Sequence, residues 1–397
     1  MQDVILGTQK QQVMSNILTK LKDDLFSSKV TRSDLASYIG VAKSTLSDIL
    51  NEHTEVSFIY LIKMIMKIYD NPLPDLKDDM ILNYLIYAKP ENRREALEYS
   101  LFQRDFDFLN DLIEKDMNSK TEENQEWAKV YGLIYKHLND AENYDPYVFH
   151  EELEEYKGVV KTKEMKVLIG ILICQTLYQL EEYTVLFKRI GHIEKEIKKI
   201  SNKYIRSSFQ VRLKEGMNVT YLMQNKIEKA RESCISLLEV CDKHVNFTLQ
   251  KSNALFNLGE SYIFENYVQS KHFLERSLLE LDNESFSQNE KIKRKARKIQ
   301  DTLTFLKILH YRDLDTLPKV LNKDDQAFLE FKRGNLITAE ILLGEMLNEN
   351  GNLDSFTTCY LGLVRDDRSL IEKSYRMFLD KNNLFYSNLP KLYLGDN

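Results

Sequence analysis

The sequence predicts an all-α protein, with an N-terminal helix-turn-helix domain followed by a superhelical array of degenerate tetratricopeptide-like repeats. The 397 residues include only 13 glycines and 6 prolines, which favours long helices with few tight turns. Residues 31–51 have the spacing of a helix-turn-helix, and a helix-pair motif recurs in the later part of the chain.

The composition limits the kinds of partner. With 43% hydrophobic and 29% charged residues, the chain has the profile of an ordinary soluble protein. Its net charge of −6 does not favour non-specific binding to nucleic acid, and residues 1–70 hold eight Lys/Arg against eight Asp/Glu. A DNA-binding domain of this charge would bind weakly alone, so we expect a homodimer that adds two half-sites.

The helix-turn-helix signal lies in residues 31–51. The inward positions of its two short helices are Leu35, Ala36, Ile39, Val41, Leu46, Ile49 and Leu50. The small side chain of Ala36 lets the helices cross closely, and Gly40 supplies the positive φ that the tight turn needs. Thr31 and Asp34 have the spacing of a capping box. Two short helices around a glycine occur in many folds, but the agreement of all inward positions favours the DNA-binding motif.

The second helix would enter the major groove of double-stranded operator DNA, with its N-terminal residues at base edges. Ala42 opens this helix where a Ser or Thr cap is common, so water or a DNA phosphate would cap it. The candidates for DNA contact point away from the apolar positions or lie on the preceding helix: Arg32, Lys43, Ser44, Thr45, Ser47 and Asp48.

Further helices surround the helix-turn-helix. Residues 10–27 carry apolar side chains at helical spacing, and residues 58–69 predict a very apolar helix that would cover the first three. The Asn-Pro-Leu-Pro run at 71–74 breaks that helix, and another is expected at 75–88. A DNA-binding domain of the phage-repressor type is therefore expected at 1–89.

A repeated helix-pair motif follows this domain. Each copy has a turn residue, an apolar residue, a small residue three positions later, and apolar residues four and eight positions beyond. The copies lie at 225–238, 258–278 and 334–347, with looser ones at 106–113 and 183–190. The period of about 34 residues, drifting to about 40, is close to that of tetratricopeptide repeats. Such pairs coil into a superhelix with a concave inner face.

The repeat array is expected to span 90–380. Residues 384–394 are apolar for a chain end, so 381–397 is interpreted as a segment that caps the last repeat or packs across a dimer interface. The run 291–298 carries six basic residues in eight. A solvated helix face is one interpretation of this run, and a contact with the DNA backbone or a charged dimer surface is the other.

The sequence lacks the motifs of catalysis and metal binding. The seven histidines are dispersed, none lies in an HExxH motif, and there is no GxSxG, GxGxxG or P-loop. The four cysteines form no CxxC pair and are interpreted as buried free thiols in a reducing cytoplasm. We therefore expect no enzyme activity, no metal and no cofactor.

The location expected from the sequence is the cytoplasm. The N-terminus lacks the basic and apolar regions of a signal peptide. The longest aliphatic run, near 167–174, is far shorter than the stretch of about 20 residues that spans a membrane, so no membrane partner is expected.

Polar side chains on the expected inner face predict a peptide ligand. An extended peptide has free N–H and C=O groups, and an asparagine amide can both donate and accept hydrogen bonds. In a helix expected at 248–264, Asn253, Asn257 and Glu260 fall on neighbouring rows. Arg and Glu side chains together could hold a peptide's carboxylate and a basic side chain. The alternative is that these are exposed polar residues without a partner.

The full set of candidates for peptide contact combines this helix with the preceding pair and one later position. It consists of Asn202, Arg206, Arg212, Asn218, Asn253, Asn257, Glu260 and Gln326.

The layout resembles the peptide-sensing regulators of Gram-positive bacteria, the RRNPP group, and within it the AimR arbitrium receptors of temperate Bacillus phages. The stretches that carry the resemblance are REALEYS at 94–100, WAKVYGLIYK at 127–136, NKYIRSSFQVR at 202–212 and LGESYIF at 258–264. They span most of the repeat region.

The resemblance implies a dimeric cytoplasmic transcription regulator that binds a short communication peptide, of about six residues, in the repeat groove. It implies that the free receptor binds operator DNA and activates a gene that promotes lysis, whereas peptide suppresses this activity and favours lysogeny. The family groove uses asparagines and charged residues. Near Tyr221, where a clamp asparagine would be expected, this chain has Val219 with Asn218 beside it.

Two alternatives remain from the sequence. One is a host quorum-sensing regulator with the same layout and a different peptide or none. The other is a protein-interaction scaffold whose N-terminal domain has lost DNA binding, which the neutral charge of that domain would allow.

Overall fold

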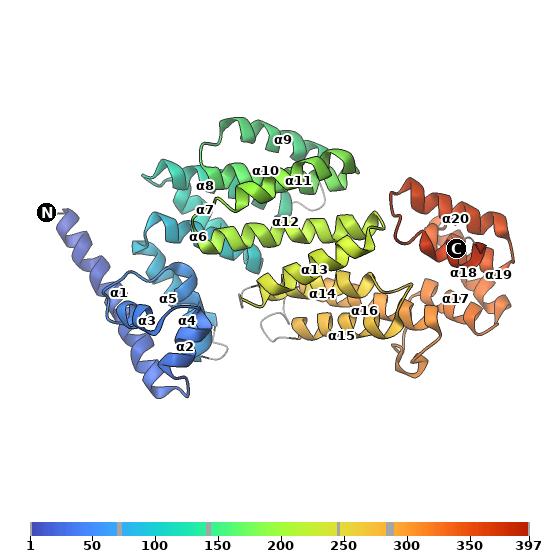
Figure 1. Cartoon of the computed structure of the whole chain (residues 1–397), viewed down its shortest axis with the longest axis horizontal. Coiled ribbons are helices and arrows are strands. Elements are labelled where there is room, and N and C mark those ends of the chain that lie inside the picture. The colour runs from blue at the N-terminus through green and yellow to red at the C-terminus, as the bar shows by residue number, and fades with distance from the viewer. Residues whose placement is uncertain (1, 70–73, 140–143, 244–246, 283–289, 396–397) are drawn as a thin grey trace. The chain divides into compact units, whose positions relative to one another are not determined.

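The computed structural model describes residues 2–69, 74–139, 144–243, 247–282 and 290–395. These residues form twenty-one α-helices and one short 3-10 helix, and no β-strand occurs among them (Figure 1). The predicted all-α class is confirmed. The helices divide into two compact units. Unit 1 consists of Met1–Ile173 with Lys195–Phe209, and unit 2 of Cys174–Glu194 with Gln210–Asn397.

Unit 1 begins with the helices of the predicted DNA-binding domain and continues into further helix pairs. Its complete helices are α1 (Gln2–Ser27), α2 (Arg32–Ile39), α3 (Lys43–Leu50), α4 (Phe58–Tyr69), α5 (Pro74–Tyr87), α6 (Pro90–Gln103), α7 (Phe106–Met117), α8 (Glu122–Asn139) and α9 (Pro146–Val159). Most of α10 (Lys163–Gln179) also belongs to it, as do the end of α11 (Tyr183–Ile197) and the start of α12 (Lys203–Met223).

Unit 2 contains the remainder of α10 to α12 and the later helix pairs. The helices are α13 (Ile227–Cys241), α14 (Thr248–Glu260), α15 (Tyr267–Leu281), α16 (Glu290–His310), η3 (Leu314–Thr316), α17 (Lys323–Lys332), α18 (Leu336–Asn350), α19 (Ser355–Val364), α20 (Arg368–Asp380) and α21 (Asn388–Leu394). From α13 to α20, each helix packs on the next in the chain, as expected for an array of helix pairs.

The helix-turn-helix forms as predicted. Gly40 has φ of 86° and ends α2, and the predicted capping box joins Thr31 and Asp34 at the start of that helix. Leu35, Ala36 and Ile39 of α2 are buried together with the apolar residues of α3. Local sequence rules therefore account for most of this motif, although Val41, which was predicted to face inward, is only half-buried.

Two helix boundaries differ from the predictions. The helix expected at 10–27 begins eight residues earlier, at Gln2. Once a helix has formed, each further residue extends it more easily than a new helix begins. The helix expected at 248–264 ends at Glu260, because residues 261–265 form the turn before α15. The predicted break at 71–74 lies mostly outside the described residues, and α5 begins at Pro74. The polar composition of residues 283–290 also predicts a turn, and this stretch lies outside the described residues except for the first residue of α16.

Small residues allow the paired helices of unit 2 to approach closely. A Cβ atom added to Gly259 of α14 would lie 2.8 Å from Cγ of Leu274 and 3.1 Å from its backbone nitrogen. The hydroxyl of Ser270 donates to the carbonyl oxygen of Gly259 at 2.8 Å. The same arrangement recurs at Gly362, where an added Cβ would lie 2.9 Å from the backbone nitrogen of Ile371. At Gly259 and Gly362, therefore, no side chain larger than hydrogen fits between the paired helices.

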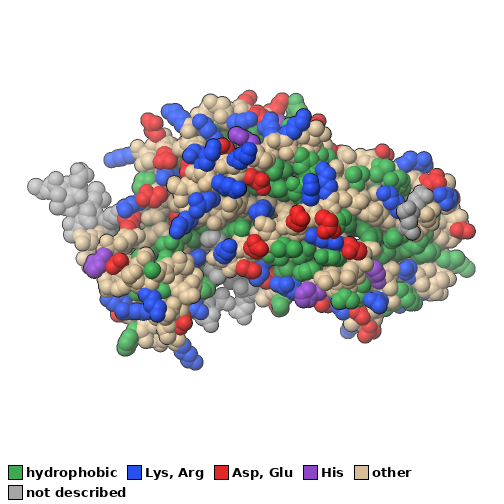
Figure 2. Space-filling view, in the orientation of Figure 1, with side chains coloured by type: hydrophobic (Ala, Val, Ile, Leu, Met, Phe, Trp, Pro, Cys, Tyr) green, Lys and Arg blue, Asp and Glu red, His purple; other side chains and the backbone are tan. Residues whose placement is uncertain are grey.

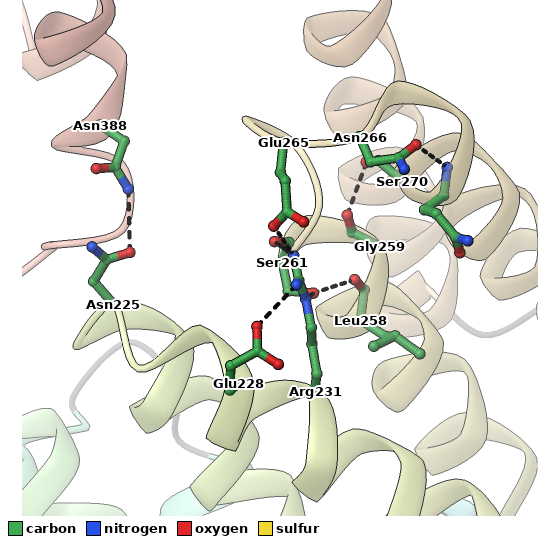
Figure 3. A network of polar contacts seen from close by, with 11 residues as sticks. Asn225, Glu228, Arg231, Leu258, Gly259, Ser261, Glu265, Asn266, Ser270 and Asn388 are labelled. Atoms are coloured by element: carbon green, nitrogen blue, oxygen red, sulfur yellow. Dashed lines mark hydrogen bonds and ion pairs between the residues drawn. The ribbon is translucent and has the colours of Figure 1, made fainter. Parts of the chain in front are cut away.

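Arg231 of α13 ties α13 to the end of α14 (Figure 3). Its guanidinium donates to the carbonyl oxygen of Ser261 at 2.9 Å and to Glu265 at 2.6 Å, and it also pairs with Glu228. The guanidinium lies 3.7 Å from the centre of the Tyr262 ring. The turn that follows α14 is thereby held by a side chain from the preceding helix.

The C-terminal segment packs inside unit 2. Its last helix, α21, lies against α19 and α20. The backbone N–H groups of Leu384 and Phe385 donate to the carbonyl oxygen of Met223 at 2.9 and 3.2 Å. Figure 3 shows Asn388 donating to Asn225, at 3.2 Å. The segment thus contacts the turn between α12 and α13 as well as the last helix pair.

Among the described residues, the structure contains no helix with the length and apolarity required to cross a bilayer.

Candidate functional site

The predicted DNA-contact residues lie on the outer surface of α2 and α3. Arg32, Lys43, Ser44, Thr45 and Asp48 are exposed, and Ser47 is half-buried, where its hydroxyl accepts a hydrogen bond from Asn51. Ala42 precedes α3 and provides no side-chain cap. The first N–H groups of α3 are therefore available to an anion such as a phosphate.

The helix-turn-helix packs on α4 through α2. Lys63 is only 5% exposed, and its ammonium donates to the carbonyl oxygen of Ile39, at the end of α2, at 3.2 Å. Burial lowers the pKa of Lys63. The carbonyl groups at a helix C-terminus attract a cation, so this contact stabilises α2 against α4.

Unit 2 contains a connected group of charged and polar side chains on α12, α14 and α16, together with the C-terminal segment. We call it the polar cluster and define it as Glu215, Asn253, Glu260, Lys295, Lys298 and Tyr386. The Asn253 amide donates to Glu215 at 2.8 Å. The Tyr386 hydroxyl donates to Glu260 at 2.6 Å. The predicted polar stripe of α14 thus faces groups from three other segments.

The basic run at 291–298 contributes two lysines to this cluster. The ammonium groups of Lys295 and Lys298 lie 3.8 and 5.3 Å from the centre of the Phe256 ring. Lys295 is half-buried, whereas Lys298 is exposed at its edge. The interpretation of the run as a solvated helix face is therefore wrong for Lys295, because its ammonium lies over the Phe256 ring of α14.

Burial sets the charge balance of the cluster. Loss of water and the nearby charge of Lys298 together lower the pKa of Lys295 to about 8, against the opposing effect of Glu260 and Glu215. Burial raises the pKa of Glu260, and Lys298, the Tyr386 hydroxyl and Lys295 act in the opposite direction. Both groups would gain from a partner of opposite charge that excludes water.

Two asparagines beside the cluster have unused hydrogen-bonding capacity. Asn218 is 0% exposed, and neither its amide nitrogen nor its amide oxygen has a hydrogen-bond partner among the described residues. It lies one turn beyond Glu215 on the same face of α12. Asn257 is 6% exposed and lies one turn beyond Asn253 on α14. No hydrogen bond connects its side chain to another residue that the structure describes.

The other predicted peptide-contact residues are distributed differently. Asn202 and Arg206 lie in unit 1, where Asn202 donates to Glu95 at 2.8 Å and Arg206 donates to the carbonyl oxygen of Ile200 at 3.0 Å. Arg212 on α12 and Gln326 on α17 lie in unit 2, and both are half-buried.

Sequence reasoning missed Lys295, Lys298, Glu215 and Tyr386 as members of the cluster. A partial signal for the two lysines was present, because they lie three residues apart on one helix and therefore on one face of it. No sequence signal places Tyr386 beside Glu260, since 126 residues separate them.

Two surface clefts occur in unit 1. One, of about 440 Å³, is lined mainly by residues of α5, α6 and α7, and the other, of about 600 Å³, by residues of α8, α9 and the segment 160–162. Neither contains a predicted site residue. Among the described residues, no group of His, Cys, Asp and Glu side chains could hold a metal ion. On the face drawn in Figure 2, acidic and basic side chains are interspersed.

The four cysteines, all in unit 2, are buried and free. Burial raises the pKa of Cys174 to about 11 and the pKa values of Cys234 and Cys359 to about 12. Such thiols are poor nucleophiles and poor metal ligands at neutral pH.

The exposed helix-turn-helix and the polar cluster define a class of protein in which a helix-turn-helix motif is joined to helical repeats. A family model described as "AimR transcriptional regulator-like" matches residues 78–395. The chain therefore belongs to the AimR-like family of transcriptional regulators. The resemblance noted in the sequence is confirmed.

Individual relatives agree with this assignment. An uncharacterised protein of Bacillus anthracis is 37% identical over 246 residues, which cover 62% of this chain and 90% of that protein. The AimR transcriptional regulator of Bacillus phage phi3T is 23% identical, covering 83% of this chain and 84% of its own. The AimR transcriptional regulator of Bacillus phage SPbeta is 22% identical, with 96% of each chain covered.

Solved structures share the fold. "Structure of SeMet-phAimR" has a TM-score of 0.75 at 20% identity and covers 96% of both chains. "Structure of phAimR-Ligand" has a TM-score of 0.61 at 22% identity, covering 83% of this chain and 95% of that one.

Proposed function

We propose that this chain is a peptide-controlled transcription regulator of a phage lysis–lysogeny decision. It binds operator DNA when free and is switched off by a short peptide bound at the polar cluster. The observation that carries the proposal is Asn218, a fully buried amide with both hydrogen-bonding atoms unpaired. A buried unpaired amide is destabilising, and hydrogen bonds to a ligand would remove that cost. Membership of a family of transcriptional regulators supports the same role.

The cluster offers each kind of contact that a short peptide needs. Lys295 and Lys298 would bind its C-terminal carboxylate, and Glu260 would bind a cationic group. Asn218, Asn253 and Asn257 would pair with peptide N–H and C=O groups, because an amide both donates and accepts. Arg212 and Gln326 remain candidate contacts in the same unit.

The DNA-binding surface would combine base and phosphate contacts. The side chains of Lys43, Ser44, Thr45, Ser47 and Asp48 would face base edges, with Arg32 beside them. The uncapped N-terminus of α3 would bind a phosphate. The protein would work in the cytoplasm as a homodimer, with residues 1–89 binding DNA, 90–380 binding peptide and 381–397 capping the array or the dimer.

Peptide can control DNA binding only if it binds two states of the dimer unequally. A tenfold change in operator occupancy requires a difference of about 1.4 kcal/mol in peptide affinity between the two states. We propose that the free dimer spaces its α3 helices to match two half-sites, and that peptide favours a state in which the spacing no longer fits.

DNA binding is tested by selecting a duplex from a randomised pool with the full-length protein. Lys43→Ala and Ser44→Ala should each weaken binding of the selected duplex by about 1–3 kcal/mol, the effect of losing a base contact. Lys120→Ala, an exposed lysine between α7 and α8, is the control and should leave the affinity unchanged. Selection of no duplex would favour the scaffold interpretation.

Peptide control is tested by calorimetry with a pool of synthetic hexapeptides and then with the tightest binder. Saturation with that hexapeptide should release the selected duplex. An operator affinity that does not change on saturation would contradict the proposed switch. A reading frame beside the gene that encodes a short secreted pro-peptide would favour the phage role over a host regulator.

A further inference from the structure

The N-terminus of α4 is capped by another helix. The N–H groups that begin a helix have no partner within it. In α4, the N–H of Phe58 donates to the Asn92 side chain at 3.2 Å, and the N–H of Ile59 donates to the Glu95 carboxylate at 3.2 Å. Both acceptors lie on α6. Ser57 accepts from the next N–H group with its hydroxyl and from the one after that with its carbonyl.

The same carboxylate has a second partner. The side-chain amide of Asn202 donates to the other oxygen of Glu95 at 2.8 Å. The carbonyl oxygen of that amide accepts from the N–H of Ile205, so Asn202 also caps the start of α12. Glu95 is 5% exposed. One buried carboxylate therefore holds the first turn of α4 and the start of α12 together, within unit 1.

The first turn of α4 is tightly packed around this junction. Phe58 is fully buried and packs against Tyr84 and Tyr99, with ring centroids at 6.3 and 5.5 Å. Tyr84 donates to the carbonyl oxygen of Val56 at 2.7 Å, just before α4. Further along α4, Lys63 holds the end of α2. A shift of the α4 cap would therefore be transmitted to α2 and α3.

We propose that Glu95 is a positioning residue for the helix-turn-helix and that Asn202 couples its position to α12. This inference rests on the proposed function, because α12 is also the helix that carries Arg212, Glu215 and Asn218. A ligand that displaces α12 along its axis would draw the Asn202 amide away from Glu95 and loosen the cap of α4. The junction thus links peptide binding to the orientation of α3.

The test removes the amide that donates to Glu95 and keeps a side chain that can cap α12. Asn202→Ser retains an N-cap residue for α12 but cannot reach Glu95 with an amide. Asn202→Asp also keeps the cap acceptor and places a second carboxylate against Glu95. The matched control is Asp145→Ser, which exchanges the cap of α9 in the same unit without touching α4. Circular dichroism confirms that each full-length variant is folded.

The first readout needs no ligand. Hydrogen exchange at the amides of Phe58 and Ile59 should be about tenfold faster in both Asn202 variants than in the wild type and in the control. Equal exchange in all four proteins would overturn the inference, whatever the outcome of the DNA and peptide experiments.

The second readout is the factor by which the selected hexapeptide changes affinity for the selected duplex. In Asn202→Ser this factor, measured at saturating peptide, should fall at least fivefold towards one. An unchanged factor in both variants would overturn the coupling role and leave the proposed function intact. A factor of one in the wild type would instead contradict the proposed function.

Discussion

Polar side chains in the helix-turn-helix differ from those in and beside the polar cluster in their exposure and in their hydrogen bonding. In the helix-turn-helix, Thr31 and Asp34 satisfy each other at the surface, and the proposed contact residues are mostly exposed. In the polar cluster, Glu260 and Asn218 are buried, and Asn218 lacks partners among the described residues. The capping groups of the first region are paired within the protein, whereas the second region holds a buried amide that a ligand could pair. We therefore expect substitutions beside the cluster to change ligand binding more than stability, and substitutions at the helix-turn-helix turn to change stability.

The largest expected effect concerns helix packing in the unit that carries the cluster. Gly259→Ala should lower the free energy of unfolding by about 1–3 kcal/mol, because its Cβ would collide with the backbone and side chain of Leu274. Gly344→Ala is the control, since no atom lies within 4 Å of an added Cβ there. Urea titration measures both. A neutral Gly259→Ala would mean that α14 and α15 can separate without loss.

The next effect separates binding from stability. Asn218→Ala should weaken binding of the selected hexapeptide at least tenfold, or about 1.4 kcal/mol, while stability changes by less than about 1 kcal/mol. Removing the unpaired amide offsets the small cavity that is left. Ser252→Ala is the contrast, because Ser252 and Ser277 share buried hydrogen bonds. It should lose stability without losing peptide affinity. Equal affinity in wild type and Asn218→Ala would contradict the proposed site.

Two aspartates, Asp34 in the helix-turn-helix and Asp325 in unit 2, have pKa values shifted in opposite directions. The hydrogen bonds from Thr31 lower the pKa of Asp34, whereas burial raises the pKa of Asp325 on α17 to about 7, with Asp324 and Asp301 adding to the shift. Between pH 4 and 7 the folded protein binds more protons at Asp325 than the unfolded chain does, so stability falls as pH rises through this window.

Asp325→Asn should abolish the fall in stability that ionisation of Asp325 causes between pH 4 and 7. It should raise the free energy of unfolding by about 1–3 kcal/mol at pH 8 and have little effect at pH 4. The control is Asp366→Asn, which changes an exposed carboxylate. Thermal melts at the two pH values provide the measurement. A gain that is the same at both pH values would rule out titration of Asp325 as its cause.

The smallest expected effect tests the helix-turn-helix turn. Gly40→Ala should lower stability by about 1 kcal/mol, because φ of 86° is strained for any residue with a Cβ, although no atom within 4 Å would meet it. Gly191→Ala in α11 also meets no atom and should be neutral or stabilising, since alanine favours a helix. Equal behaviour of the two variants would show that the turn tolerates a change of backbone conformation.

Much of the fold could be predicted from the sequence because its signals are local. The inward residues of α2 and α3, the capping box and the turn at Gly40 lie within twenty-one consecutive residues, and each follows from helical spacing or backbone sterics. The repeat motif at Gly259 and Ser270 was visible for the same reason. The polar stripe on α14 was also predicted from spacing, and Asn253 and Glu260 do meet partners from other elements.

The composition of the site could not be predicted in full, because its contacts join distant segments. Neither the Tyr386 contact with Glu260 nor the Asn202 contact with Glu95 has a periodic signature, and the latter joins residues 107 positions apart. Asn202 illustrates the limit. Its residue type suits peptide binding, yet its amide is used between α6 and α12 in unit 1.

The placement of the single tryptophan and the four cysteines supplies an independent reporter for each unit. Trp127 is 2% exposed in unit 1 and stacks on Tyr131, whereas every cysteine lies in unit 2. Indole fluorescence therefore follows melting of the first unit, and the rate of alkylation by a maleimide follows opening of the second. Both signals, recorded over the same series of denaturant concentrations, would show whether the two units unfold together or one after the other.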